Sequence, residues 1–281
     1  MRFKAVLPKI LVGLLLAIVM FFYLFPMYWM VATSFKSMAE LYAYPPTMLP
    51  AQPTIEPYTN VLVQKGYVQL IKNSLIVNVL TIVLTLILSL LINYPIVRMK
   101  IPNKVGRRVL NGVLTIRFLP GIVMIIPFFA IIRTIGLYDS IFSLVLIYTV
   151  YSLPLAVYML NGFLKEVPVE LEEAALVDGA TRFYSFLFIT LPLLAPAILA
   201  ITVITFALSW NEFLFALILT ATPKSQTFSI GVWRLVSQFQ ILWNEMAAVG
   251  VIASLIPVIL IIFARRYVIT ALTFGMVREK A

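Results

Sequence analysis

The side chains that most often carry chemistry in proteins are scarce in this sequence. Its 281 residues include no His and no Cys, so the commonest proton shuttle and the thiolate nucleophile are both absent. No GxxxxGK[ST] motif occurs, and without it the chain has no P-loop for a nucleotide phosphate. We therefore expect no catalytic residue, no metal site and no cofactor bound by this chain.

The richest polar stretch runs from Val167 to Pro196 and predicts two short helices. Pro168 suits the first position of a helix, where its missing N–H costs nothing. Gly179 is placed to end that helix in a left-handed conformation, and Thr181 is placed to cap the second helix. Three acidic side chains crowd the first turns, where the helix dipole favours negative charge: Glu170, Glu172 and Glu173. The pattern indicates a helix–turn–helix suited to contact with another molecule.

Composition places this stretch between the apolar runs of an integral membrane protein. Hydrophobic residues make up 62% of the chain and charged residues 11%, whereas soluble proteins average about 25% charged residues. The net charge of +10 does not indicate a nucleic-acid partner, because the basic residues gather beside apolar runs. That distribution is typical of membrane orientation.

Six apolar runs are long enough to cross a bilayer, so we predict an all-α integral membrane fold of one domain, residues 1–281. The spans are expected at about residues 10–31, 73–97, 109–132, 141–163, 193–220 and 246–263. The proline-rich segment 34–72 and the segment 221–245 then share one side of the membrane. A tail at 265–281 lies on the other side.

Polar side chains recur every three or four residues along the second run, which places them on one helix face. Hydrogen bonding between helices is the favoured interpretation, and a pathway lining is the alternative. These residues are Ser74, Asn78, Thr81, Thr85, Ser89 and Asn93.

The basic residues orient the chain. Of its 21 Lys and Arg residues, 15 lie on the side of the two termini and 6 on the other, so both termini are expected in the cytoplasm. Arg117 is counted near the inner end of the third span, close enough to snorkel to the interface; a functional role inside the span is the alternative. Pro120 and Pro127 predict that this span is bent.

Specific residues in the polar stretch carry a family resemblance. Glu173-Ala174-Ala175, three further residues, Gly179, nine further residues and then Ile189-Thr190-Leu191-Pro192 are similar to the EAA loop of bacterial ABC importer permeases. ELEEAALVDGA, followed by LPLLAPA and by Trp210-Asn211-Glu212-Phe213, resembles the carbohydrate subfamily, and most of all the smaller permease subunit of maltose-type importers. The likeness covers nearly the whole chain, including RFLPG at Arg117 to Gly121 and LPLAVYMLNGFL at Leu153 to Leu164.

The resemblance implies a type I ABC importer permease fold with six transmembrane helices, in the bacterial cytoplasmic membrane. A cytoplasmic coupling loop, at about 164–192, would dock on a separate ATPase that binds ATP and Mg. Its coupling residues would be Glu173, Ala174, Ala175, Gly179, Ile189, Leu191 and Pro192. The implied partners are a second permease subunit, two ATPase subunits, an extracytoplasmic solute-binding protein, a sugar substrate and membrane lipid. The tail would contact the ATPase pair through Leu272, Thr273, Phe274, Gly275 and Met276.

A pathway for sugar needs hydrogen-bonding groups and aromatic rings. The candidates in the fourth and fifth spans are Tyr148, Tyr151, Trp210, Asn211 and Glu212. Aromatic residues in membrane proteins also serve as interfacial belts and packing groups, and Glu212 is equally well explained as a hydrated carboxylate at the outer interface. Two further alternatives concern function: a permease for a non-sugar solute such as a phosphorylated polyol, and an ion-coupled secondary carrier.

Overall fold

The computed structural model describes residues 3–99, 101–235 and 241–274, and these residues form helices and connecting turns with no β-strand. Contacts along the chain divide it into two compact units. The first consists of Met1–Val68 with Gly231–Ile256, and the second of Gln69–Ile230 with Pro257–Ala281.

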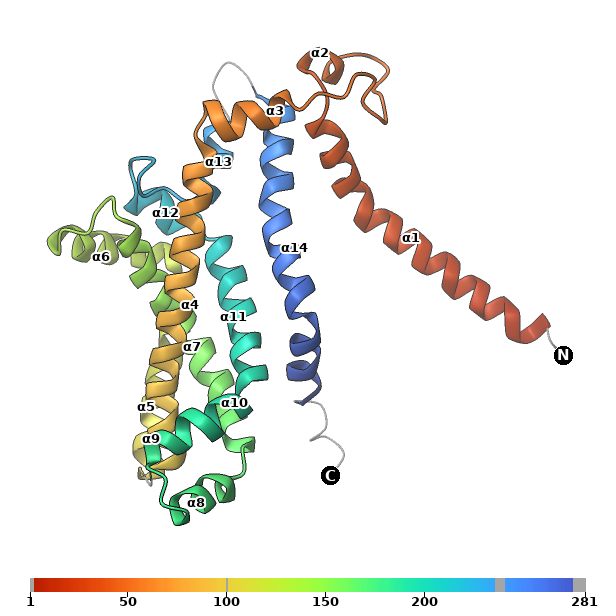
Figure 1. Ribbon diagram of the computed structural model, residues 1–281. Helices are drawn as coiled ribbons and strands as arrows, with labels where there is room; N and C mark the ends of the chain where they lie inside the picture. Colours follow the sequence, from red (N-terminus) through yellow and green to blue (C-terminus); the bar gives the residue numbers. More distant parts are fainter. Residues whose placement is uncertain (1–2, 100, 236–240, 275–281) are drawn as a thin grey trace. The chain divides into compact units, whose positions relative to one another are not determined.

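The first unit contains the N-terminal helix and the segment that follows it (Figure 1). An ion pair between Lys65 and Glu245 joins its two stretches of chain, and Asn244 Nδ2 donates to the Lys36 carbonyl oxygen at 3.2 Å. These contacts hold the segment 36–65 against the start of the last helix. The elements are α1 (Phe3–Ser34), α2 (Met38–Leu41), α3 (Glu56–Thr59), η1 (Asn60–Gln64) and the first turns of α14 (Trp243–Phe274).

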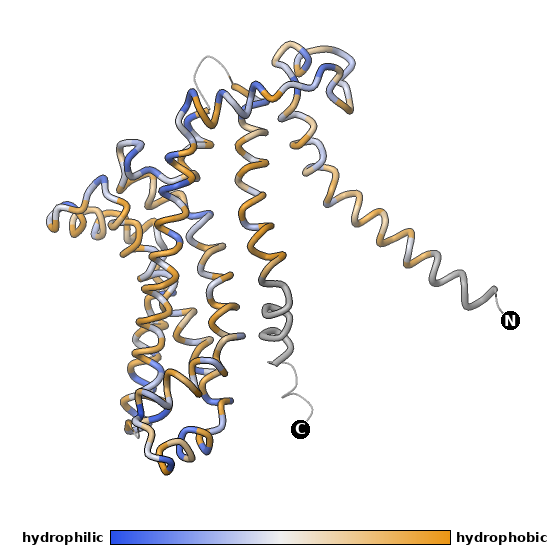
Figure 2. The backbone as a smooth tube through the Cα atoms, viewed as in Figure 1, coloured by the Kyte–Doolittle hydropathy of each residue, from blue (hydrophilic) through white to orange (hydrophobic). Residues whose placement is uncertain are grey.

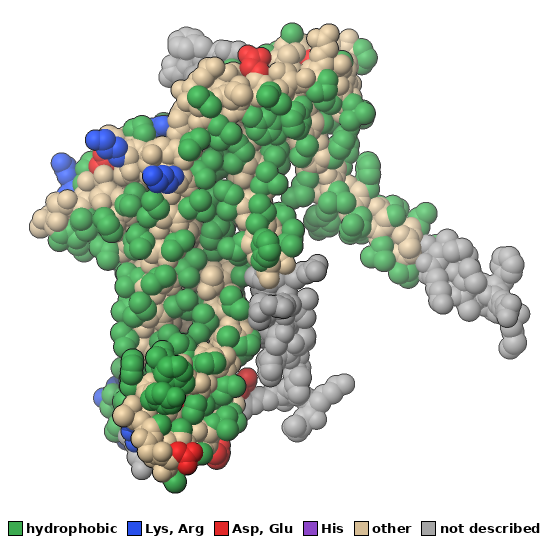
Figure 3. Space-filling view, in the orientation of Figure 1, with side chains coloured by type: hydrophobic (Ala, Val, Ile, Leu, Met, Phe, Trp, Pro, Cys, Tyr) green, Lys and Arg blue, Asp and Glu red, His purple; other side chains and the backbone are tan. Residues whose placement is uncertain are grey.

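The second unit is a helix bundle built on α4 (Tyr67–Arg98), α7 (Ile141–Glu166) and α11 (Ala195–Trp210). Buried apolar side chains of α7 form one core with Phe215 and a second with Ile201. Figure 2 shows hydrophobic residues along these helices and hydrophilic residues at their connections. In Figure 3 the charged side chains of this unit lie toward its two ends, with hydrophobic side chains between them. This distribution suits a body that crosses a bilayer.

The polar face predicted for the second span is confirmed. All six of its residues are buried, each at most 3% exposed. Asn93 Nδ2 donates to the Val157 carbonyl oxygen at 3.0 Å, and Asn161 Nδ2 donates to Asn93 Oδ1 at 2.9 Å. Ser209 Oγ donates to Asn78 Oδ1 at 2.5 Å. Hydrogen bonding between helices, the favoured interpretation, is therefore confirmed for Asn78 and Asn93, whereas the buried hydroxyls of Thr81 and Thr85 make no hydrogen bond with described residues.

The third predicted span is broken rather than continuous. It consists of α5 (Asn103–Thr115), η2 (Ile116–Phe118) and α6 (Gly121–Thr134). The chain bends by 103° between residues 103–118 and α6. The break falls at Pro120, whose extended backbone, with ψ of 132°, cannot continue a helix. The predicted bend at Pro120 is confirmed, whereas Pro127 lies inside α6.

Arg117 lies farther from the start of its span than the snorkelling prediction assumed, and that prediction stays untested. It follows the 13 residues of α5, which at about 1.5 Å per residue carry it well away from the start of that helix. It lies instead in η2, next to the break.

The fifth predicted span is also interrupted. A 68° bend separates the helical run Arg182–Leu193 from α11, and α11 ends at Trp210. A new short helix, α12 (Leu214–Leu219), begins after three residues. The prediction of one continuous helix to residue 220 is wrong, because the backbone leaves the helix at residues 211–213.

The remaining spans are helices that extend a few residues beyond the predicted bounds. In the described part, four helices are long and apolar enough to cross a membrane, and up to six spans result if each bent pair counts as one. The helix α14 continues to Phe274, so residues 265–274 of the predicted tail are helical.

Candidate functional site

The polar stretch forms the predicted helix–turn–helix. The first helix, α8 (Val169–Val177), begins directly after Pro168, which is its N-cap residue rather than its first helical residue. Gly179 has a φ of +89°, the left-handed conformation that a helix-ending glycine adopts. Thr181 Oγ1 accepts a hydrogen bond from the Tyr184 N–H at 3.2 Å and so caps the second helix. The structures predicted for Gly179 and Thr181 are confirmed.

The second helix is not uniform. It consists of α9 (Arg182–Ser185), a π-helical segment η3 (Phe186–Thr190) and α10 (Leu191–Leu193). Single π-helical turns inside helices occur frequently at functional sites.

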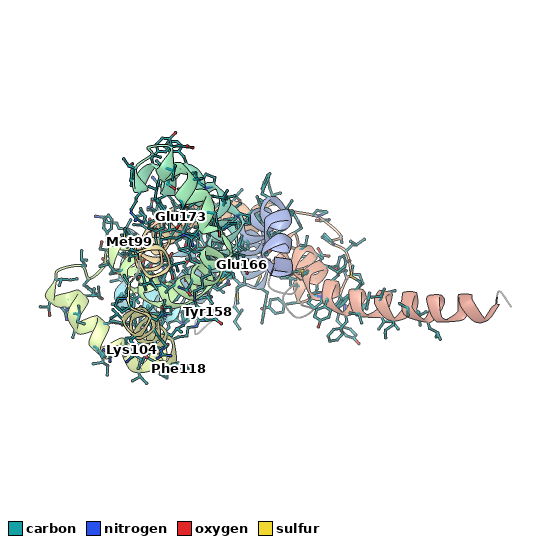
Figure 4. All side chains as sticks on the ribbon, turned by 90° about the horizontal axis from the view of Figure 1, so that it is seen from below. Met99, Lys104, Phe118, Tyr158, Glu166 and Glu173 are labelled. Atoms are coloured by element: carbon teal, nitrogen blue, oxygen red, sulfur yellow. The ribbon has the colours of Figure 1, made fainter. Side chains whose placement is uncertain are left out.

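The predicted coupling residues lie at one end of the second unit. Figure 4 views the molecule from that end and labels Glu173 together with Met99, next to the end of α4, and Glu166, at the end of α7. The exposed members are Glu173, Ala174, Gly179 and Pro192, and the half-buried members are Ala175, Ile189 and Leu191. A surface hollow between α8 and α9 is lined by Ala175, Asp178, Gly179, Ala180, Thr181 and Tyr184.

Glu172 differs from its acidic neighbours because it is buried, with 6% of its surface exposed. Its Oε1 accepts from Arg98 Nε and from Thr190 Oγ1, each at 2.7 Å, and its Oε2 accepts from the Tyr94 hydroxyl at 3.0 Å. A terminal guanidinium nitrogen of Arg98 also donates to the Val167 carbonyl oxygen at 2.7 Å. We call these five residues the Glu172 cluster.

The electrostatics of the cluster keep Glu172 ionised. Burial alone would raise the pKa of Glu172, but hydrogen bonds from Thr190, Arg98 and Tyr94 outweigh burial and hold the pKa below its ordinary value. The positive charge of Arg98 acts in the same direction. A buried ion pair is stable only when its remaining hydrogen-bonding groups find partners, and here four donors are satisfied.

A second candidate site lies where the two broken spans approach one another within the second unit. Its cavity, of about 280 Å³, is lined by Arg117, Gly121, Tyr148, Tyr151, Ser152, Leu208, Ser209, Glu212, Leu214 and Phe215. Arg117 is exposed and forms no ion pair with any residue in the described ranges. The Tyr151 hydroxyl is buried and makes no hydrogen bond with described residues. The cavity thus offers a cation and hydroxyl groups to an oxygen-rich ligand.

The other pathway candidates lie at the end of α11. Trp210 is buried and stacked between two rings, with centroid distances of 5.4 Å to Phe206 and 6.0 Å to Phe228. Asn211 is exposed and does not line the cavity. The structure therefore brings Tyr148, Tyr151 and Glu212 together at the cavity, and leaves Trp210 in a packing position.

Glu212 has a structural partner as well. Its two carboxylate oxygens accept from the backbone N–H groups of Phe215 at 3.0 Å and Ala216 at 3.3 Å, at the first turn of α12. An acidic side chain at this position satisfies otherwise unpaired helix donors. Glu212 is thus held in place beside the cavity by the helix that it caps.

The predicted tail residues fall at the limit of the structure. Leu272, Thr273 and Phe274 are the last residues of α14, while Gly275 and Met276 lie outside the described residues.

Comparison with known proteins defines the class of this membrane protein. The family model for the inner membrane component of binding-protein-dependent transport systems matches residues 86–274. The chain belongs to this family, which confirms the resemblance inferred from the residues around Glu173.

Individual relatives match over nearly the whole chain. The inner membrane ABC transporter permease protein YcjP of Escherichia coli is 32% identical over 266 residues, which cover 94% of each protein. The diacetylchitobiose uptake system permease protein DasC of Streptomyces coelicolor is 32% identical over 93% of this chain and 95% of its own length. The trehalose/maltose transport system permease protein MalG of Thermococcus litoralis is 28% identical over 98% of this chain and 99% of its own.

Solved structures confirm the predicted permease fold. A chain of a bacterial ABC transporter that imports the acidic polysaccharide alginate superposes with a TM-score of 0.79 at 21% identity, covering 94% of this chain and 96% of that one. A chain of the methionine ABC transporter MetNI in an inward-facing conformation gives a TM-score of 0.59 at 19% identity, covering 77% and 98%.

Sequence reasoning missed Arg98 as the partner of Glu172, and it gave a functional role of Arg117 only as the alternative. Arg98 is 74 residues from Glu172 in the sequence, and no local pattern links the two. For Arg117 a signal was present, since an ionisable residue inside an apolar span is costly and usually functional.

Proposed function

We propose that this chain is one of two permease subunits of an ATP-driven importer that carries a sugar or oligosaccharide into the cytoplasm. The observation that carries the proposal is the helical loop 164–192, in which two short helices present Glu173, Ala174 and Gly179 on an exposed face. Such a face suits docking on a separate ATPase. Sugar is favoured as the substrate because several relatives are named as permeases for sugars.

The proposed partners are inferred from the missing P-loop and from the exposed apolar surface of α1. It has no P-loop, so ATP and Mg would be bound by two copies of an ATPase subunit. The most apolar stretch of α1 has none of its residues buried, which supports cover by a second permease subunit and by lipid. The excess of basic residues on one side of the spans favours cytoplasmic termini. A solute-binding protein would then dock on the opposite face.

The cavity near Arg117 is the proposed sugar pathway in this subunit. Tyr148 and Tyr151 offer rings and hydroxyl groups, and Glu212 offers a fixed carboxylate. Asn211, which is exposed, would lie at the entrance. The last turn of α14 and the tail from Leu272 to Met276 would contact the ATPase pair.

The coupling role is tested by Glu173→Lys and Gly179→Val in the importer reconstituted with its ATPase and binding protein. The first variant reverses a charge on the docking face. The second places a β-branched residue at a φ of +89°, at a cost of roughly 1–2 kcal/mol. Both should abolish most of the ATP hydrolysis stimulated by trehalose, maltose or diacetylchitobiose, whichever the wild type transports, while the amount of permease in the membrane is unchanged.

Glu170→Lys is the matched control, because Glu170 is exposed on the same helix and undergoes the same charge change. It should retain most of the stimulation. Wild-type stimulation in both Glu173→Lys and Gly179→Val would refute the coupling role.

A further inference from the structure

The Glu172 cluster joins four elements that are separate in the sequence. Tyr94 and Arg98 come from the inner end of α4, Val167 from the junction of α7 and α8, Glu172 from α8 and Thr190 from η3. The Arg98 and Glu172 side chains are each only 7% exposed. Both helices of the loop and the end of α4 therefore meet at one carboxylate.

The cluster provides the buried side-chain attachment of α8 to α4. Glu172 is the only residue of α8 that is buried, and Val177 at its end is 87% exposed. A force applied to the exposed face of α8 can therefore reach α4 through Glu172, beside the chain connection to α7 and the packing of α8 on α9 and η3. Ring contact between Tyr94 and Phe186, with centroids 4.7 Å apart, strengthens the same junction.

From this junction α4 leads into the bundle. Its buried polar face is hydrogen-bonded to α7 through Asn93 and to α11 through Asn78. The residue at the α11 end of the second bond, Ser209, also lines the cavity near Arg117. Hydrogen bonds at Arg98 and at Asn78, joined by α4 itself, thus connect the loop with the proposed pathway.

We propose that the Glu172 cluster is a rigid link that makes α8 and the inner end of α4 move as one body during transport. Glu172 is then a positioning residue, which acts on the pathway through α4 and not by touching the substrate or the ATPase. The inference rests on the proposed coupling function of the loop. It implies that α4, a helix outside the loop, moves when the loop moves.

The test measures the distance between α8 and α4 in the assembled importer. Because the chain has no native Cys, spin labels can be placed at Val177→Cys and Leu91→Cys, which are 87% and 65% exposed. Pulsed electron paramagnetic resonance gives the distance distribution without nucleotide and after trapping with ATP and vanadate. A rigid link predicts the same narrow distribution in both states.

Glu172→Gln removes the charge but keeps the shape of the side chain, and should shift or broaden the distribution in the trapped state. Glu170→Gln is the matched control and should leave it narrow. If Glu172→Gln fails to assemble, Thr190→Val keeps the ion pair, removes one hydrogen bond and should give a smaller broadening.

A distance that changes between the two states of the unsubstituted importer would overturn the proposal, as would a narrow, unshifted distribution in Glu172→Gln. These outcomes differ from failure of the coupling role itself. That role fails only if Glu173→Lys and Gly179→Val retain stimulated ATP hydrolysis.

Discussion

Asp139 fixes two loops on the side of the second unit opposite the coupling loop. Its carboxylate accepts from the Ala221 N–H at 2.8 Å, from the Thr222 N–H at 3.0 Å and from the Thr222 and Ser225 hydroxyl groups. Its φ of +58° is left-handed, which Asp and Asn tolerate better than most residues. Burial acts to raise the pKa of Asp139, but these hydrogen bonds outweigh it and lower the pKa to about 2.

This lowered pKa predicts how the loop contact depends on pH. An unfolded Asp has a pKa of about 3.9, so the stabilisation from Asp139 is complete above that pH and is lost as the pH falls toward about 2. Hydrogen exchange at Ala221 and Thr222, corrected for intrinsic rates, should therefore accelerate over this window. Asp139→Asn keeps the backbone conformation, removes the charge and should abolish the pH dependence. Equal pH dependence in both proteins would contradict the assignment.

At this scale, local signals were predictable and distant partners were not. Gly179 predicts a turn and Thr181 predicts a helix cap, because the preferences behind both act over only three or four residues. The pairing of Glu172 with Arg98 depends on how α4 and α8 pack, and no local sequence pattern shows that these two residues are close in space. The dipole argument therefore treated Glu170, Glu172 and Glu173 alike, and it did not predict that Glu172 is buried while Glu173 is exposed.

At the scale of elements, hydropathy locates the spans but not their breaks. Asn211 and Glu212 interrupt an otherwise apolar run, but hydropathy averaged over a whole span does not show that α11 ends at Trp210. At Pro120 the warning was present, because proline removes a helix donor. The polar face of α4 was predictable in full, since its period of three to four residues is a property of one helix.

The interruption after Trp210 predicts which residues become accessible during transport. Single cysteines at positions 210, 211 and 212 can be labelled without background, because the chain has no Cys. Asn211→Cys should react with a membrane-impermeant thiol reagent more in the ATP-trapped importer than at rest. Trp210→Cys should react least, because Trp210 is stacked between Phe206 and Phe228.

Labelling that is equal in both states at all three positions would mean that this segment only packs against its neighbours. Labelling of Trp210→Cys above that of Asn211→Cys would contradict the packed position assigned to residue 210.

At the scale of the whole molecule, the class of fold is predictable because composition, hydropathy and the distribution of charge indicate the same one. Charge scarcity, six apolar runs and asymmetric basic residues all indicate a multi-span membrane protein, and the family match at residues 86–274 confirms the permease inferred from the resemblance. The same membership favours an importer over the ion-coupled carrier. The shape of the cavity was not predictable in the same way, because the second break beside it, at residues 211–213, has no proline to mark it.

The central claim is that this chain works as one subunit of a larger ATP-driven importer. Its most direct test is purification of the chain from its native membrane in mild detergent, followed by quantitative mass spectrometry of what accompanies it. We predict a second permease in equal amount and an ATPase in twofold amount, with ATP hydrolysis that vanadate inhibits. Recovery of this chain without any ATPase, under conditions in which it still transports sugar, would contradict the account.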